Sequence, residues 1–172
     1  DALPIYGTGV FFMLYLFFVF FAPNVLGEVI NYIPADPLKT PTHIVPEWYF
    51  LPYYAILRAT PNNFIGDWMG FVLIDAKLAG VIAMFAATLI LFALPWLDRC
   101  TVRSARYRPI YKQMFWIFLL DCIVLGWVGA KAPEGIYLVI GRIASAYYYG
   151  HFLGVIPLLG WFEKTRPVPE SI

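Results

Sequence analysis

The stretch from Leu3 to Val25, LPIYGTGVFFMLYLFFVFFAPNV, decides the class of this protein. It lies inside a run that has no charged residue between Asp1 and Glu28. A helix needs about 20 apolar residues to cross the roughly 30 Å hydrocarbon core of a membrane. The rest of the chain has the same character, because 61% of its 172 residues are hydrophobic and only 13% are charged, about half the usual charged share. These values exclude an ordinary soluble domain and indicate an integral membrane protein.

Three further apolar runs follow, so the sequence predicts four transmembrane helices, at about residues 3–25, 78–97, 113–130 and 137–162. The runs lack the two-residue alternation of membrane strands and are roughly twice as long, which favours helices. We therefore predict an all-α membrane protein, with residues 1–172 forming a single domain. The formal net charge of +1 gives no reason to expect a nucleic-acid partner.

The distribution of charge predicts which side of the membrane each connection faces. The connector from Asp98 to Lys112 carries five basic residues and one acidic residue. The positive-inside rule places such a connector on the cytoplasmic or matrix face. The segment from Glu28 to Lys77 carries three basic and five acidic residues, so we expect it on the opposite, electropositive side.

A long loop, residues 28–76, separates the first two predicted spans. Loops of this length are either functional or disordered, and this one is too apolar for disorder. Its six prolines fix the backbone in extended or turn shapes, so we expect a rigid loop. Within it, the segment PEWYFLPYYAILR at 46–58 predicts a short helix. Pro46 would lie next to the start of this helix, Glu47 in its first turn, and Pro52 should bend or interrupt it.

The same loop carries a recognisable motif. The segment ADPLKTPTHIVPEWYFLPYYAILRATPNN at 35–63 resembles the loop between the fifth and sixth helices of cytochrome b, the quinol-oxidising subunit of cytochrome bc complexes. The resemblance continues through IDAK at 74–77, RYRP at 106–109 and GRIASAYY at 141–148. It implies the carboxyl-terminal half of a cytochrome b of the bc1 type, carrying the last four of eight helices.

The resemblance also implies a quinol-oxidation site. Oxidising a quinol releases protons, so the site needs a base within hydrogen-bond reach of the quinol hydroxyl. Glu47 has this role in the family, and its proline and aromatic neighbours would partly desolvate it. The alternative is an acid that caps a helix and faces water. The resemblance implies quinol contacts for Pro46, Glu47, Tyr49, Phe50 and Tyr54. Tyr49 and Phe50 could equally be interfacial aromatics. Docking of the Rieske iron–sulfur protein is implied for His43, Ile44 and Val45.

Cofactors and partners follow from the same resemblance. A b-type haem needs two histidines from facing helices, and the only histidines here are His43, in the loop, and His151, in the fourth predicted span. We expect the haems to be held by the missing amino-terminal half or by a partner chain. The expected substrate is ubiquinol, and the expected protein partners are the amino-terminal half of cytochrome b, the Rieske protein and cytochrome c1. We expect the complex to be dimeric. The chain should cross a bacterial inner (plasma) membrane or the mitochondrial inner membrane several times and contact its lipid.

Two other functions remain open at this point. Asp121 lies inside the third predicted span, where carboxylates are costly and often functional. A proton or ion transporter could use Asp121 and Glu47 as relay groups, and a third possibility is a non-catalytic anchor subunit of a redox complex. The plainer interpretation of Asp121 is a buried acid that bonds to a neighbouring helix. Asp1 lies near the place where the family has a second quinone site, and His151 is expected to be a packing residue beside Gly150 and Gly154, whose spacing lets helices approach closely.

Overall fold

The computed structural model describes residues 2–25, 27, 29–34, 36–38, 44–61 and 76–168. Every regular element within these residues is helical and none is a strand, which confirms the all-α prediction. The chain divides into two compact units, Asp1–Trp48 and Tyr49–Ile172, and each is described by itself. A single membrane domain over residues 1–172 stays a prediction.

The first unit is built around α1, Ala2–Phe21, followed by a 3-10 turn, η1, Val29–Tyr32. Side chains on every face of α1 are exposed, and most of them are apolar. A helix that is apolar all round suits lipid or a buried position rather than water. It ends before the predicted Val25 because Pro23 follows, and the residue before a proline avoids the α-helical region.

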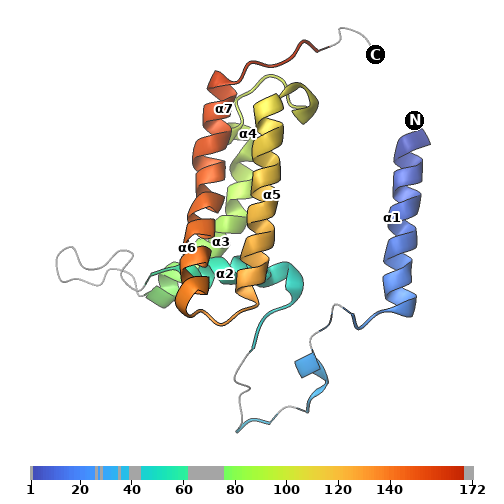
Figure 1. Cartoon of the computed structure of the whole chain (residues 1–172), viewed down its shortest axis with the longest axis vertical. Helices are drawn as coiled ribbons and strands as arrows, with labels where there is room; N and C mark the ends of the chain where they lie inside the picture. Colours follow the sequence, from blue (N-terminus) through green and yellow to red (C-terminus); the bar gives the residue numbers. More distant parts are fainter. Residues whose placement is uncertain are drawn as a thin grey trace, which may run out of the picture. The chain divides into compact units, whose positions relative to one another are not determined.

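The second unit is a bundle of long helical segments with a short helix lying across one end (Figure 1). The short helix, α2, Leu51–Ala59, packs against α3, α5 and α6. The long segments are α3, Ala76–Leu89, continuing through η3, Ile90–Ala93, into α4, Leu94–Leu97; α5, Pro109–Gly129; and α6, Gly135–Gly150, continuing through the π-helical turn η5, His151–Val155, into α7, Ile156–Phe162.

Three helical stretches of the described residues are long and apolar enough to cross a membrane: Leu3–Phe21, Lys77–Leu97 and Pro109–Gly129. They coincide with the first three predicted spans. The third begins earlier than the predicted residue 113, because the fixed φ of Pro109 suits the first turn of a helix.

The fourth predicted span, 137–162, is helical along its length but is not one regular α-helix. The N–H of Ile156 bonds to the carbonyl of His151, five residues back, so the chain makes a π turn. Pro157 follows, and it has no N–H to donate to the carbonyl that an α-helix would present. The wider π turn accommodates this break, and neither α6 nor α7 alone reaches the length of a span.

Two adjacent tyrosines of α6 tie that helix to α3. The hydroxyl of Tyr148 donates to the carbonyl of Ala87 at 2.9 Å, and the hydroxyl of Tyr149 donates to the carbonyl of Ala83. Around them, the core of the bundle is formed by Ala55, Ile56, Ala87, Leu125, Ala144, Tyr148, Phe152 and Ile156. The predicted close helix approach at Gly150 and Gly154 is not found, because no described atom lies near the position of an added Cβ at either residue.

A buried ion cluster closes the opposite end of the bundle from α2. The fully buried side chain of Arg108 contacts Asp98 at 2.7 Å and Glu163 at 3.1 Å. Glu163 also accepts the backbone N–H groups of Ile110 and Tyr111 at 2.8 and 2.9 Å, which caps the start of α5. Burial lowers the pKa of Arg108, but its bonds to Asp98 and Glu163 raise that pKa more, so it lies above the ordinary value and the guanidinium stays charged.

Candidate functional site

The motif residues are distributed between the two units. Residues 44–47 belong to no regular element, and Val45, Pro46 and Glu47 are half-buried. The 3-10 turn η2, Trp48–Phe50, follows and leads directly into α2. Glu47 therefore precedes the helical segment and does not lie in its first turn, contrary to the prediction. His43 lies outside the described residues.

Pro52 does not bend or interrupt the helix, contrary to the prediction. It occupies one of the first two positions of α2, where a proline costs nothing because the N–H groups there have no partner within the helix. The helix that follows therefore runs without a break to Ala59. Tyr54 lies on it and is half-buried, while the ring of Phe50 lies 5.9 Å from the ring of Tyr53.

Glycines of the long helices let α2 lie directly on their backbones. A Cβ added at Gly129 of α5 would overlap the carbonyl oxygen of Leu51, and one added at Gly80 of α3 would come within 2.6 Å of the carbonyl oxygen of Leu57. At Gly141 of α6 the nearest atom would be a Val128 methyl carbon at 3.3 Å. Val128 belongs to α5, and the Ala59 side chain of α2 lies at an ordinary 3.8 Å from that position. The backbones of α3 and α5 therefore form a close-fitting seat for α2, and α6 packs beside it.

Two arginines satisfy the carbonyl groups that helix ends leave without partners. Arg58 of α2 donates to the carbonyls of Gly129 and Lys131, at 3.2 and 2.9 Å, where α5 ends. Arg142 of α6 donates to the carbonyl of Ala59 at 3.2 Å, where α2 ends. These bonds fasten α2 to α5 at one point and to α6 at another.

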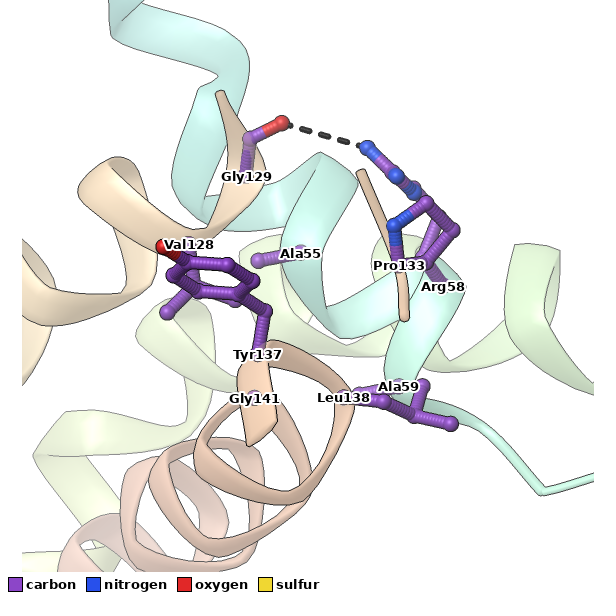
Figure 2. Close-up of a pocket in the computed structure, with 9 residues that line it drawn as sticks. All are labelled: Ala55, Arg58, Ala59, Val128, Gly129, Pro133, Tyr137, Leu138 and Gly141. Carbon is purple, nitrogen blue, oxygen red and sulfur yellow. Dashed lines mark hydrogen bonds between the residues drawn. The ribbon is translucent and has the colours of Figure 1, made fainter. Parts of the chain in front are cut away.

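A small pocket lies beneath α2, between α5 and α6. Figure 2 shows the Arg58 side chain and the Tyr137 ring on its walls, with the bond from Arg58 to Gly129 drawn. It has room for about one water molecule, so it is a packing gap rather than a substrate site. A larger groove of about 490 Å³ lies between α2, α3 and α6, and four of its ten lining residues are alanines.

Two polar residues of the predicted spans, His151 and Asp121, lie among apolar side chains of the bundle. His151 is buried and its ring is stacked on Phe118 at 4.5 Å, as expected for a packing residue. Asp121 lines a groove of about 360 Å³ between α5 and α6 with Tyr147. One carboxylate oxygen of Asp121 and the hydroxyl of Tyr147 are buried, and neither makes a hydrogen bond within the described part of the chain. The predicted bond from Asp121 to a neighbouring helix is therefore not found for that oxygen.

No haem or metal site can be assembled from the side chains that the structure describes. No three histidine, cysteine, aspartate or glutamate side chains come together there. His151, stacked on Phe118, has no described histidine facing it, so it does not fit the paired ligation of a b-type haem.

Comparison with known proteins identifies the family. The model of the family described as cytochrome b (C-terminal)/b6/petD matches residues 34–149, about two thirds of the chain. The chain belongs to this family. The match includes the PEWY motif at 46–49 and the whole of α2 and its seat.

Individual relatives carry the same name. A cytochrome b of Rhodospirillum rubrum is 56% identical over 97% of this chain, and a cytochrome b/c1 of Bradyrhizobium diazoefficiens is 53% identical over 97%. A solved structure described as a hyperthermophilic respiratory Complex III superposes with a TM-score of 0.73 and 35% identity, covering 90% of this chain. The chain spans 38% of the Rhodospirillum protein, 22% of the Bradyrhizobium protein and 36% of the solved chain.

Sequence reasoning missed the groups that hold α2 in place. Arg58 and the seat glycines Gly80 and Gly129 were not singled out, although Tyr54 and Arg58 are four residues apart, the spacing that puts two side chains of a helix in contact. The contacts of Gly80 and Gly129 could not be found from the sequence, because they involve residues far away along the chain.

Proposed function

We propose that this chain is the carboxyl-terminal part of the quinol-oxidising subunit of a ubiquinol–cytochrome c reductase, or cytochrome bc1, complex. The observation that carries the proposal is the PEWY motif of a cytochrome b family member, placed directly before a helix that packs closely on three long helices. A rigid support suits a site that must hold a quinol and a proton acceptor in fixed geometry.

The chain crosses the membrane four times in this proposal. The continuous helical stretch from Gly135 to Phe162 supplies the fourth crossing, because 28 residues at about 1.5 Å each exceed the roughly 30 Å core despite the π turn. The connector rich in arginine then faces the cytoplasm or matrix, and α2 lies at the electropositive surface. The membrane is a bacterial inner membrane or the mitochondrial inner membrane.

Glu47 is the proton acceptor of the reaction. A quinol gives up two electrons and two protons, and a carboxylate beside its hydroxyl can take one proton as the electrons leave. Pro46, Tyr49 and Phe50 contribute walls, and Tyr54 offers its hydroxyl to the substrate. His43, Ile44 and Val45 form part of the surface that receives the Rieske protein.

The two electrons leave through other polypeptides. One passes to the Rieske iron–sulfur protein and on to cytochrome c1, while b-type haems, held by the amino-terminal half of cytochrome b, carry the other across the membrane. This chain's own residues bind the quinol, orient it and take up its proton. The complex is expected to be dimeric. Membership of the cytochrome b family disfavours a transporter, and the PEWY motif disfavours a bare anchor.

The substitution Glu47→Gln tests the proposal in the complete complex. It keeps the size of the side chain but removes the proton-accepting group, and loss of a positioned base typically slows a reaction by about 10² to 10⁴-fold. We expect slow ubiquinol oxidation with an altered pH profile and normal haem content. Glu134→Gln is the matched control, because Glu134 is an exposed acid on the turn before α6. An unaltered rate for Glu47→Gln across the pH range would overturn the role of Glu47.

A further inference from the structure

The guanidinium group of Arg58 is fixed in position by the end of α5. Its Nη1 and Nη2 atoms donate to two different carbonyl groups, those of Gly129 and Lys131. The planar fork of an arginine side chain suits two acceptors at once and loses little freedom in binding them. The guanidinium group of Arg58 is therefore fixed to the end of α5 as well as to its own helix, α2.

The fixed guanidinium lies against the ring of Tyr54. The Cζ atom of Arg58 is 4.8 Å from the ring centroid of Tyr54, within the range of a cation–π contact. Tyr54 is half-buried. The guanidinium covers one face of its ring and so favours the side-chain orientation in which the two groups touch.

In the described part of the chain, Arg58 is held by groups other than acids. The ion pairs found there are those of Arg108, at the other end of the bundle. The described bonds of Arg58 are made to backbone carbonyls, and its described ring contact is to Tyr54. Arg58 thus links the end of α5 to the ring of Tyr54, and this link restricts the movement of that ring.

We propose that Arg58 is a positioning residue of the quinol site, which holds the Tyr54 ring against the end of α5 so that its hydroxyl meets the quinol in one orientation. This inference rests on the proposed function, in which Tyr54 contacts the quinol. Since Glu47 rather than Tyr54 accepts the proton, loss of the orientation weakens binding of substrate and transition state alike. The KM for quinol should then rise while kcat changes little.

A double-mutant cycle in the complete, membrane-extracted complex tests the inference. Arg58→Gln, Tyr54→Leu and the double variant are compared with the parent, using a short-chain ubiquinol as substrate and rates expressed per b-type haem. Arg142→Gln is the matched control, because Arg142 also bonds to an end of α2 but has no described contact with Tyr54. We expect Arg58→Gln to raise KM about three- to thirty-fold, the range for loss of one partly desolvated cation–π contact.

The cycle separates positioning from general damage to α2. In the Tyr54→Leu background, Arg58→Gln should change KM by less than about twofold, because its effect acts through the ring. Arg142→Gln should leave KM within about twofold of the parent. If Arg58→Gln fails to assemble, Arg58→Lys carries the same cycle, since it keeps the charge but cannot reach both carbonyls.

Two results would overturn the inference in distinguishable ways. If Tyr54→Leu raises KM but Arg58→Gln raises it by the same factor with or without the ring, the positioning role fails and the proposed site stands. If Tyr54→Leu alone leaves KM and kcat unchanged, the assignment of Tyr54 to the quinol site fails, and the role of Arg58 fails with it.

Discussion

Removing the carboxylate of Glu163 should loosen the end of the bundle opposite α2. This side chain is fully buried and makes three bonds, one to Arg108 and two to the first backbone N–H groups of α5. Breaking a buried ion pair by deleting one partner costs about 3 to 5 kcal/mol, and losing a helix cap costs about 1 kcal/mol. Asp98 still pairs with Arg108 and is partly exposed, so we expect about 3 to 4 kcal/mol for Glu163→Ala.

Hydrogen exchange measured by mass spectrometry gives the local readout. Every 1.4 kcal/mol is a factor of ten in an equilibrium constant, so exchange in residues 109–116 should accelerate roughly a hundred- to a thousand-fold in Glu163→Ala. Glu163→Gln keeps an oxygen for the two N–H groups and should lie between this variant and the parent. Lys164→Ala, at the exposed neighbour, should change nothing. If Glu163→Ala exchanges no faster than Lys164→Ala in this segment, the cluster does not hold the start of α5.

Three further predictions concern the seat of α2, the buried acid and the topology. Gly129→Ala should lower the free energy of unfolding in detergent by about 1 to 3 kcal/mol through overpacking. Gly154→Ala should be tolerated, because no described atom lies near the added Cβ. Equal stability of the two variants would contradict the close packing of α2 on α5. Asp121→Leu should raise the stability of the detergent-solubilised chain by about 1 to 3 kcal/mol, because it removes a buried oxygen without a described partner; a destabilised variant would mean that this carboxylate is satisfied. A membrane-impermeant reagent should label a cysteine at Arg103 only from the cytoplasmic or matrix side and one at Asp36 only from the other side, and labelling of both from one side would refute the four-span topology.

Hydrophobic run length predicted three of the four expected spans, because spanning is a property of a segment by itself. The apolar runs around α1, α3 and α5 needed no knowledge of their neighbours, since lipid requires only that a helix be apolar and about 20 residues long. Helix boundaries were less accurate where side chains from elsewhere intervene. The helix α5 begins at Pro109 rather than at residue 113. The proline suits a first helical turn, and Glu163, 52 residues away from Tyr111, accepts the backbone N–H groups there.

The sequence by itself determined the class, the helical content and the family. Apolar run lengths and the PEWY motif are local properties, so a pattern of neighbouring residues is enough to detect them. Whether Glu47 and Tyr54 act together on a quinol stays a prediction, because these residues belong to different units.

Only the tertiary structure decided how α2 is held. The overlap between an added Cβ at Gly129 and the carbonyl of Leu51, and the bond from Arg58 to Lys131, join residues more than 70 positions apart. A glycine in a membrane helix has many possible uses, and an arginine can pair with any nearby acceptor. Their roles depend on which backbone lies opposite them, and that is set by the packing of four helices against one another rather than by the order of residues in any one of them.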